Sequence, residues 1–136
     1  MSKTSNKVNK KQSSSSPQLK TSAEILDLIK NSLDESKADN IVTIDLAGKT
    51  SIADFMIIAS GDSRRKVAFL AEYLCKKLKN AGTGKLLMEG RTNCDWILID
   101  AGDIIVHLFR PDIRDFYNLE KIWITPQTKS TVEKSI

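Results

Sequence analysis

The stretch that decides the fold is Glu89–Trp123, EGRTNCDWILIDAGDIIVHLFRPDIRDFYNLEKIW. Its alternating apolar residues predict two β-strands, Cys94–Asp100 and Asp103–Phe109. Ala101 and Gly102 lie between them as a two-residue turn, because glycine adopts the positive φ that tight hairpin turns require. The stretch is therefore predicted to form an antiparallel hairpin followed by a short helix.

A turn at these two residues sets which side chains face each other across the hairpin. The expected pairs are Asp100 with Asp103, Leu98 with Ile105, and Trp96 with His107. One face of the hairpin is wholly aliphatic and must belong to the core: Ile97, Ile99, Ile104, Val106 and Leu108. The other face mixes aromatic and aliphatic residues with a histidine and two acids. That composition fits either a position under a helix or a docking surface.

The residues before this stretch predict a helix and two strands. A capping box, T-x-x-E at Thr21–Glu24, marks the start of a helix that ends near Lys37. Alternation predicts a strand over Asn40–Leu46, whereas the almost wholly apolar run Asp54–Ser60 is typical of a strand covered on both faces. These two strands could pair with each other through a longer connection.

A second helix and a short strand lead into the hairpin, and a last helix follows it. Asp62 or Ser63 is the expected N-cap of the second helix, and Gly82 marks its end. The short strand is expected at Lys85–Gly90 and the last helix at Ile113–Trp123. Three apolar residues share the buried face of that helix: Phe116, Leu119 and Trp123. The order α-β-β-α-β-β-β-α indicates an α/β fold with a mixed five-stranded sheet flanked by helices.

The length of 136 residues and the composition predict one domain between two tails. The domain is placed at residues 22–123, with a Lys/Ser-rich tail at 1–21 that is expected to be disordered and a loose tail at 124–136. No run approaches the roughly 18 apolar residues of a membrane span, and no secretory signal is expected. With Cys75 and Cys94 expected to be reduced thiols, the protein is predicted to be cytoplasmic.

Charge is unevenly distributed along the chain. Residues 1–22 hold five lysines and no acid, whereas residues 23–123 hold 14 basic and 16 acidic residues. Seven basic residues and one acid lie in Arg64–Lys85, but four acids and one base lie in Leu86–Phe109. The acidic segment favours a basic partner and the basic segment permits contact with RNA phosphate, unless both are ordinary solvated faces.

The sequence offers little for catalysis. Its one histidine, His107, has no second His or Cys at metal-ligand spacing and is expected to be a hydrogen-bonded residue under Trp96. Asp100 and Asp103 could hold Mg²⁺ near a phosphate-binding helix N-terminus, as in nucleotidyltransferases. Such enzymes usually place two acids two residues apart on one strand, whereas these two span a turn. The alternative is a helix cap and two turn acids.

Acids beside an aromatic residue predict a docking patch for a basic partner. The acids are Glu89, Asp95, Asp100 and Asp103, and the aromatic anchor is Trp96. Two acids opposite each other at the hairpin tip would repel, so a cation or a basic partner is expected there. The alternative for Trp96 is burial beneath the last helix.

Six segments carry a family resemblance: Asp54–Arg64 (DFMIIASGDSR), Glu89-Gly90, Trp96–Asp100 (WILID), Gly102-Asp103, Val106-His107 and Phe116–Trp123 (FYNLEKIW). In this order and spacing they resemble the ribosome silencing factor family (RsfS), also called the Iojap-like family. The match covers about residues 22–123. Phe55, where the family often has Tyr or Cys, and Ser60, where Thr is common, are mild departures.

The resemblance implies a protein that is not an enzyme and has no catalytic residues, cofactor or metal. It would bind the large ribosomal subunit through a basic protein at the subunit interface, universal ribosomal protein fourteen. The charge pattern itself adds the expectation that the basic segment Arg64–Lys85 faces either neighbouring rRNA, as a minor contact, or water. Occupying that surface would block the small subunit sterically and repress translation. The family is also linked to large-subunit maturation. Its fold is similar to that of nucleotidyltransferases without their catalytic acids.

The predicted partner-binding surface consists of six residues: Glu89, Trp96, Asp100, Asp103, His107 and Tyr117. Trp96 would anchor the partner, and the three acids would pair with its basic side chains. His107, Arg114 and Tyr117 either belong to the surface or brace it. Two alternatives stay open, a Mg-dependent nucleotidyltransferase-like enzyme and a homodimeric scaffold that uses the same face.

Overall fold

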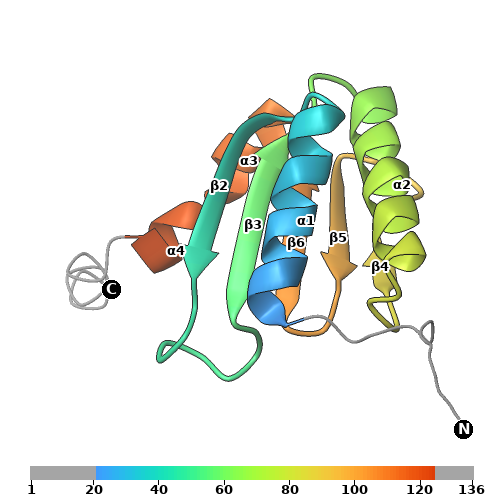
Figure 1. Ribbon diagram of the computed structural model, residues 1–136. Coiled ribbons are helices and arrows are strands. Elements are labelled where there is room, and N and C mark those ends of the chain that lie inside the picture. The colour runs from blue at the N-terminus through green and yellow to red at the C-terminus, as the bar shows by residue number, and fades with distance from the viewer. Residues whose placement is uncertain (1–20, 125–136) are drawn as a thin grey trace, which may run out of the picture.

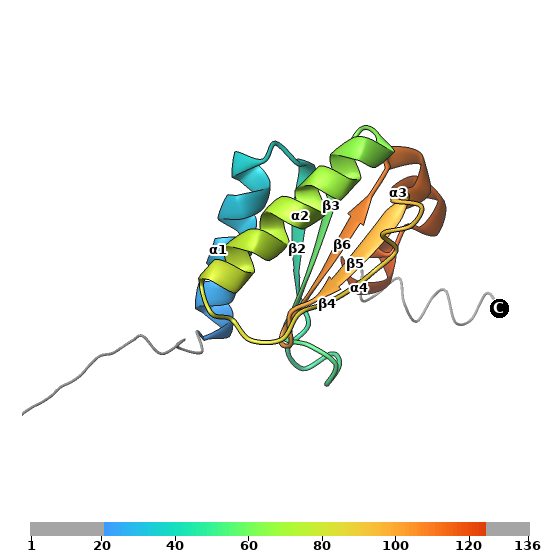
Figure 2. The ribbon, with the colours of Figure 1, turned by 90° about the vertical axis from the view of Figure 1, so that its right-hand side faces the viewer.

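The computed structural model describes residues 21–124, so the two predicted tails fall outside the described part of the chain except for residues 21 and 124. The elements follow the predicted order, with one more helix at the end. They are α1 (Ser22–Glu35), β2 (Asp39–Asp45), β3 (Phe55–Ser60), α2 (Arg64–Asn80), β4 (Leu87–Glu89), β5 (Trp96–Asp100), β6 (Ile104–Phe109), α3 (Pro111–Tyr117) and α4 (Glu120–Ile124). One sheet carries α1 and α2 on one side (Figure 1), and α3 and α4 lie on the other (Figure 2). Among these helices, none is both long and apolar enough to cross a bilayer.

The sheet has five strands in the order β2-β3-β6-β5-β4. β3 and β6 are parallel and the other neighbouring pairs are antiparallel, so the sheet is mixed, as predicted. The expected pairing of β2 with β3 is also confirmed. In β3 every residue after Phe55 is buried, because its apolar side chains meet a helical layer on each face of the sheet.

Local capping signals set where the two long helices begin. At the start of α1, the Thr21 hydroxyl accepts the Glu24 amide at 3.2 Å, and the Glu24 carboxylate accepts the Thr21 amide at 2.9 Å. This is the predicted capping box, which satisfies two otherwise free amides. At the start of α2, Ser63 is the N-cap, and its hydroxyl accepts the Lys66 amide at 3.0 Å. Gly82, with φ +70°, follows the end of α2 as predicted.

Two apolar cores hold the layers together, one on each face of the sheet. The larger core lies between the sheet and the pair α1 and α2, and it contains the aliphatic face of the hairpin. Each of its hairpin residues is at most 1% exposed, which confirms the prediction: Ile97, Ile99, Ile104, Val106 and Leu108. The second core packs β2, β3 and β6 against α3 and α4, with Phe109 fully buried in it. Burying one such side chain contributes about 1.5–3 kcal/mol.

The hairpin register differs from the predicted one by two residues. The observed pairs are Trp96 with Phe109, Leu98 with His107, and Asp100 with Ile105, so the three predicted pairs were wrong. The turn is Gly102-Asp103, because the Ala101 amide donates to the Ile104 carbonyl at 2.9 Å and Gly102 has φ +86°. Moving the glycine to the first turn position shifts the register by two residues, which leaves the side chains of both strands on their predicted faces. Asp103, predicted to begin the second strand, is instead part of the turn.

The predicted last helix is two helices. They are separated because Asn118 adopts the left-handed conformation (φ 48°, ψ 52°) and donates its amide to the Arg114 carbonyl at 2.7 Å. The break leaves Phe116 79% exposed, so its predicted burial was wrong. Leu119 and Trp123, which follow the break, pack against the second core as predicted.

Candidate functional site

The sheet face that carries α3 and α4 is only partly covered at β4 and β5. α3 contacts β6 and α4 contacts β2, whereas Leu87 on the edge strand β4 is 50% exposed. Two cross-strand pairs lie here: Leu87 with Asp100, and Glu89 with Leu98. Because Met88 between them faces the larger core, alternation puts all four on the opposite face. We call the surface formed by these four residues, Trp96 and Tyr117 the open face.

An aromatic cluster forms the end of the open face next to α3. The Trp96 ring lies against Phe109 and Tyr117, with centroid distances of 4.8 Å to each. Phe116 meets Tyr117 edge-on at 5.0 Å. Phe109 is buried and Trp96 is half-buried, whereas Tyr117 is 49% exposed. Trp96 is therefore packed against α3 while part of its ring stays on the surface. Its role as an anchor for a partner stays a prediction.

His107 holds Trp96 in place from below. The Trp96 indole Nε1–H donates to His107 Nδ1 at 2.9 Å, as expected for a hydrogen-bonded histidine under this ring. Since Nδ1 accepts, the proton of the neutral imidazole is assigned to Nε2. His107 is 5% exposed, and burial lowers its pKa to about 4. His107 is therefore neutral at physiological pH, and its Nδ1 orients the Trp96 indole.

The buried His107 predicts a loss of stability at acid pH. An unfolded histidine takes up its proton near pH 6.5, whereas folded His107 does so at about 4. Between these values the unfolded chain binds more protons, so the free energy of unfolding falls as the pH falls, by an amount on the order of 3 kcal/mol from this residue. Urea unfolding at pH 7 and at pH 4.5 measures this change.

The control for this prediction is His107→Gln, which keeps an acceptor for the indole N–H but does not titrate. Its stability should depend less steeply on pH than that of the unmodified protein. Asp95 and Glu120, whose pKa values are also lowered, lose their contribution at acid pH equally in both proteins. The same pH dependence in both proteins would exclude His107 as its source.

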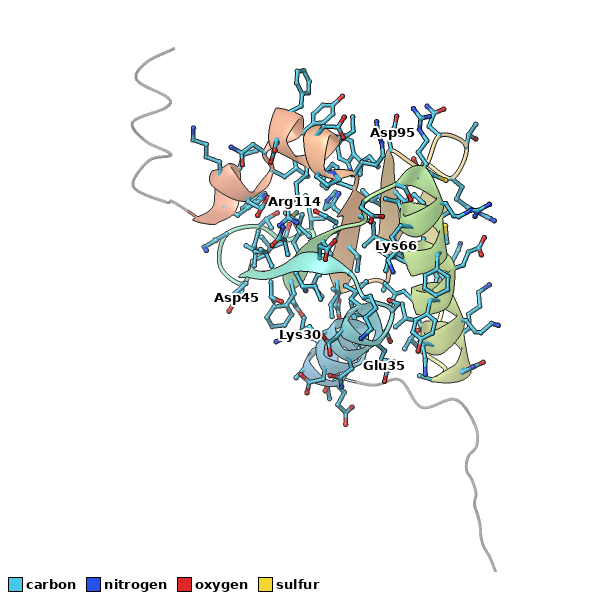
Figure 3. The ribbon with its side chains drawn as sticks, turned by 90° about the horizontal axis from the view of Figure 1, so that it is seen from above. Lys30, Glu35, Asp45, Lys66, Asp95 and Arg114 are labelled. Atoms are coloured by element: carbon cyan, nitrogen blue, oxygen red, sulfur yellow. The ribbon has the colours of Figure 1, made fainter. Side chains whose placement is uncertain are left out.

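Asp95 is neutralised within the chain. Its Oδ1 accepts the Nε–H of Arg64 and the Nε–H of Arg110, each at 2.8 Å. These hydrogen bonds hold the pKa of the Asp95 carboxyl below its usual range, and the bond from Arg64 has the larger effect. Figure 3 shows Asp95 beside the start of α2. Its carboxylate therefore ties α2 to the end of β6 and adds little free negative charge to the open face.

The three predicted partner-binding acids lie in different places. Glu89 is exposed on the open face. Asp100 is half-buried on the same face, and its Oδ1 accepts the Gly102 amide at 2.9 Å. The Asp103 carboxylate accepts the Ser22 hydroxyl at 3.1 Å, and the same hydroxyl lies 2.8 Å from Asp54. Asp103 thus turns toward the N-terminus of α1 and stands apart from the open face.

The paired carboxylates that a nucleotidyltransferase-like site would need are not formed at the hairpin tip. Asp100 and Asp103 are not opposite each other in the register, and each carboxylate accepts from a different donor. Across residues 21–124, no three side chains of His, Cys, Asp or Glu gather closely enough to hold a metal ion. The expected repulsion between the two acids depended on the turn having been placed one residue too early.

Arg114 anchors α3 and α4 to the sheet through partners that no sequence signal indicated. Its guanidinium donates twice to Glu120 (Nε–Oε1 3.0 Å and Nη2–Oε2 2.9 Å) and once to the Ser60 hydroxyl at 2.7 Å. Figure 3 shows Arg114 between these helices and the sheet. The guanidinium lowers the pKa of Glu120. Because the two partners are six residues apart, helical spacing rules do not pair them.

Comparison with known proteins identifies the family. The family model described as ribosomal silencing factor during starvation matches residues 19–136. The ribosomal silencing factor of Zymomonas mobilis is 52% identical over 99 residues, which cover 73% of this chain and 74% of that relative. A mouse relative, mitochondrial assembly of ribosomal large subunit protein 1, is 31% identical over 101 residues, or 72% of this chain and 44% of its own length.

A solved structure agrees with the sequence comparisons. The crystal structure of a protein from Chromobacterium violaceum matches with a TM-score of 0.75 and 38% identity, covering 76% of this chain and 87% of that one. A family match over most of the chain, close relatives and a shared fold all point the same way. The chain therefore belongs to the ribosomal silencing factor family, as the six sequence segments predicted.

Proposed function

We propose that this protein silences ribosomes by binding the large ribosomal subunit and preventing the small subunit from joining it, which represses translation. The description of the family model, ribosomal silencing factor during starvation, supports this function. The working domain would be residues 22–123, and it acts sterically in the cytoplasm, without catalysis, cofactor or metal. The name of the mouse relative supports the large subunit as partner and a second role in assembling that subunit.

The observation that carries the proposal is the composition of the open face. Trp96 and Tyr117 offer a large and rigid aromatic contact area, which is typical of the centre of a protein interface. Glu89 and Asp100 flank it, and neither forms an ion pair within the described residues. Aromatic anchors with unpaired acids fit a basic partner. We assign this partner as universal ribosomal protein fourteen at the subunit interface.

Sedimentation with separated ribosomal subunits tests the proposal. Purified protein is mixed with large subunits, with small subunits, and with both, at two salt concentrations. We expect it to travel with the large subunit and to shrink the peak of joined ribosomes. Binding should weaken at the higher salt concentration, because the proposed acid–base contacts are screened. If the protein stays at the top of the gradient and the subunits join normally, silencing by this route is excluded.

The sharpest variant on the open face is Tyr117→Ser. Tyr117 is exposed, so its loss should leave the fold intact while removing one aromatic anchor, with an expected 10- to 100-fold loss of large-subunit affinity. Trp96→Ala is less informative, since it also breaks the hydrogen bond to His107. The matched control is Phe69→Ser on α2, which removes an aromatic ring of nearly equal exposure, 48% against 49%. The affinity of this control variant for large subunits should stay unchanged.

The same variants separate docking from self-association. If Tyr117→Ser changes the oligomeric state in analytical ultracentrifugation but not the affinity for large subunits, the open face is a homodimer interface instead. Charge reversal by Glu89→Lys provides a second readout, because it should slow association with a basic partner. An unchanged association rate would show that Glu89 does not contact the partner.

A further inference from the structure

A basic groove runs along α2 beside the edge strand β4. Two adjoining cavities of about 350 and 80 Å³ share Glu72, Met88 and Arg91 in their walls, so they form one groove. Lys76 and Lys79 of α2 also line its larger part. We call this feature the α2 groove. Its walls carry three cations and one acid.

The cations of the α2 groove are unpaired. Lys76, Lys79 and Arg91 are exposed, and within residues 21–124 none of them forms an ion pair. The other basic side chains of α2 that have a partner point elsewhere: Arg64 to Asp95 at 2.8 Å, Lys66 to the Ser36 carbonyl at 2.7 Å, and Lys77 to Glu35 at 3.6 Å. Among the α2 basic residues without an ion pair in residues 21–124, Lys76 and Lys79 line the groove, whereas Arg65 does not. Arg91 adds a third unpaired cation to the groove.

These cations converge although they come from different segments. Lys79 belongs to α2 and Arg91 to the loop after β4, yet both act on the Cys75 thiol. Burial raises the pKa of this thiol, and the charges of the two cations oppose that shift. Cys75 and Met88 line the same groove as apolar side chains. Cations around an apolar wall produce a strong local potential, because the low-dielectric wall focuses their field.

We propose that the α2 groove binds the phosphate backbone of RNA on the large ribosomal subunit. Arg91 has a planar guanidinium that can hold a phosphate with two hydrogen bonds. Lys76 and Lys79 lie three residues apart on one side of α2, so their charges are neighbours along the groove. The groove thus has the charge complementarity that a polyanion requires.

The groove meets the open face along β4, which favours RNA of the same subunit as its occupant. Leu87 and Glu89 of this strand lie on the open face, whereas Met88 between them lines the groove. A ribosomal surface made of a basic protein and the RNA beside it would contact both sides of one edge strand. This inference rests on the proposed function, because it takes the RNA to belong to the subunit that the open face binds.

The test is the salt dependence of RNA binding by the full chain. The probe is a fluorescein-labelled single-stranded RNA oligonucleotide of mixed sequence, followed by anisotropy. The groove variant is Lys76→Gln/Lys79→Gln/Arg91→Gln, and the control Lys30→Gln/Lys49→Gln/Lys77→Gln removes the same charge elsewhere. Each lost phosphate contact flattens the plot of log affinity against log salt by about 0.7. For the groove variant, the slope should therefore become shallower by about two units, and the affinity at low salt should fall at least tenfold. The control variant should keep both the slope and the affinity of the unmodified protein.

Two outcomes would overturn this assignment. Equal losses of RNA affinity in the groove and control variants would mean that RNA binding depends on net charge and not on the groove. The five lysines of residues 1–22 are kept in both variants, so they cannot cause a difference between them. Groove-dependent binding of poly-glutamate without groove-dependent RNA binding would assign the groove to an acidic protein. Failure of the proposed function looks different: the protein would not sediment with large subunits, whatever the groove variant does with RNA.

Discussion

Arg114→Ala is expected to lower the free energy of unfolding by about 3 kcal/mol, measured by urea unfolding at pH 7. Arg114 is 7% exposed, and the Glu120 side chain that it pairs with is 22% exposed. Removing the guanidinium leaves a largely buried carboxylate and the buried Ser60 hydroxyl without their partner. The loss should be near the low end for buried ion pairs, because α4 is short and can swing outward to hydrate Glu120.

A double-mutant cycle separates the ion pair from simple loss of packing. Arg114→Met/Glu120→Leu removes both charges and should be much closer in stability to the unmodified protein than either Arg114→Met or Glu120→Leu alone. The cycle also bears on the open face, since Tyr117 follows Arg114 on α3 and packs on Trp96. Equal destabilisation in the single and double variants would show that the ion pair is not what anchors these helices.

Gly90→Ala is the second change with a large expected effect, a loss of about 3 kcal/mol or more in the free energy of unfolding. Gly90 has φ +94°, which an L side chain rarely adopts. A Cβ at this position would also overlap the backbone carbonyl oxygen of Trp96. Backbone cannot move aside as a flexible side chain can, so either the loop before β5 or the strand itself must shift.

Gly48→Ala is the matched control. Gly48 has a similar φ of +80°, but a Cβ there meets no atom within 4 Å. Its cost is therefore the backbone strain alone, about 1 kcal/mol. Thermal or urea unfolding of both variants isolates the contribution of the overlap. If both variants lost the same free energy of unfolding, the close approach of Gly90 to Trp96 would not be the cause of the loss in Gly90→Ala. Gly90→Ala should also weaken large-subunit binding, because Trp96 begins β5.

The order of elements and the two faces of the hairpin were predictable because they depend on local patterns. The capping box at Thr21–Glu24 forms the helix start that it predicts, since all its bonds lie within four residues. The hairpin register was not predictable, because a turn that includes Gly102 at either central position puts the same residues on the same face. The observed turn is reinforced from outside the hairpin: the Asp103 carbonyl accepts the amides of Asp54 at 2.7 Å and Phe55 at 3.2 Å.

The candidate site was predictable in part. Trp96, His107 and Tyr117 come together as the composition of their segments suggested, and Glu89 and Asp100 share their face. Two acids were not where their spacing implied. Asp95 forms ion pairs with an arginine at the start of α2 and with one after β6. Asp103 accepts a hydrogen bond from the Ser22 hydroxyl at the start of α1. Sequence distance carries no information about such pairs, because their partners are brought together only by folding.

The sequence by itself determined the α/β layer order, the aliphatic core face of the hairpin and the family, because periodicity, capping and motif spacing are properties of short segments. The tertiary structure alone decided which charges remain free. Asp95 is neutralised by two arginines distant in the chain, and Arg114 by Glu120 across the break between α3 and α4. Within residues 21–124 the acids of the open face and the cations of the α2 groove form no ion pair. Long-range packing chooses these partners, so the two surfaces proposed to meet the ribosome exist only in the folded protein.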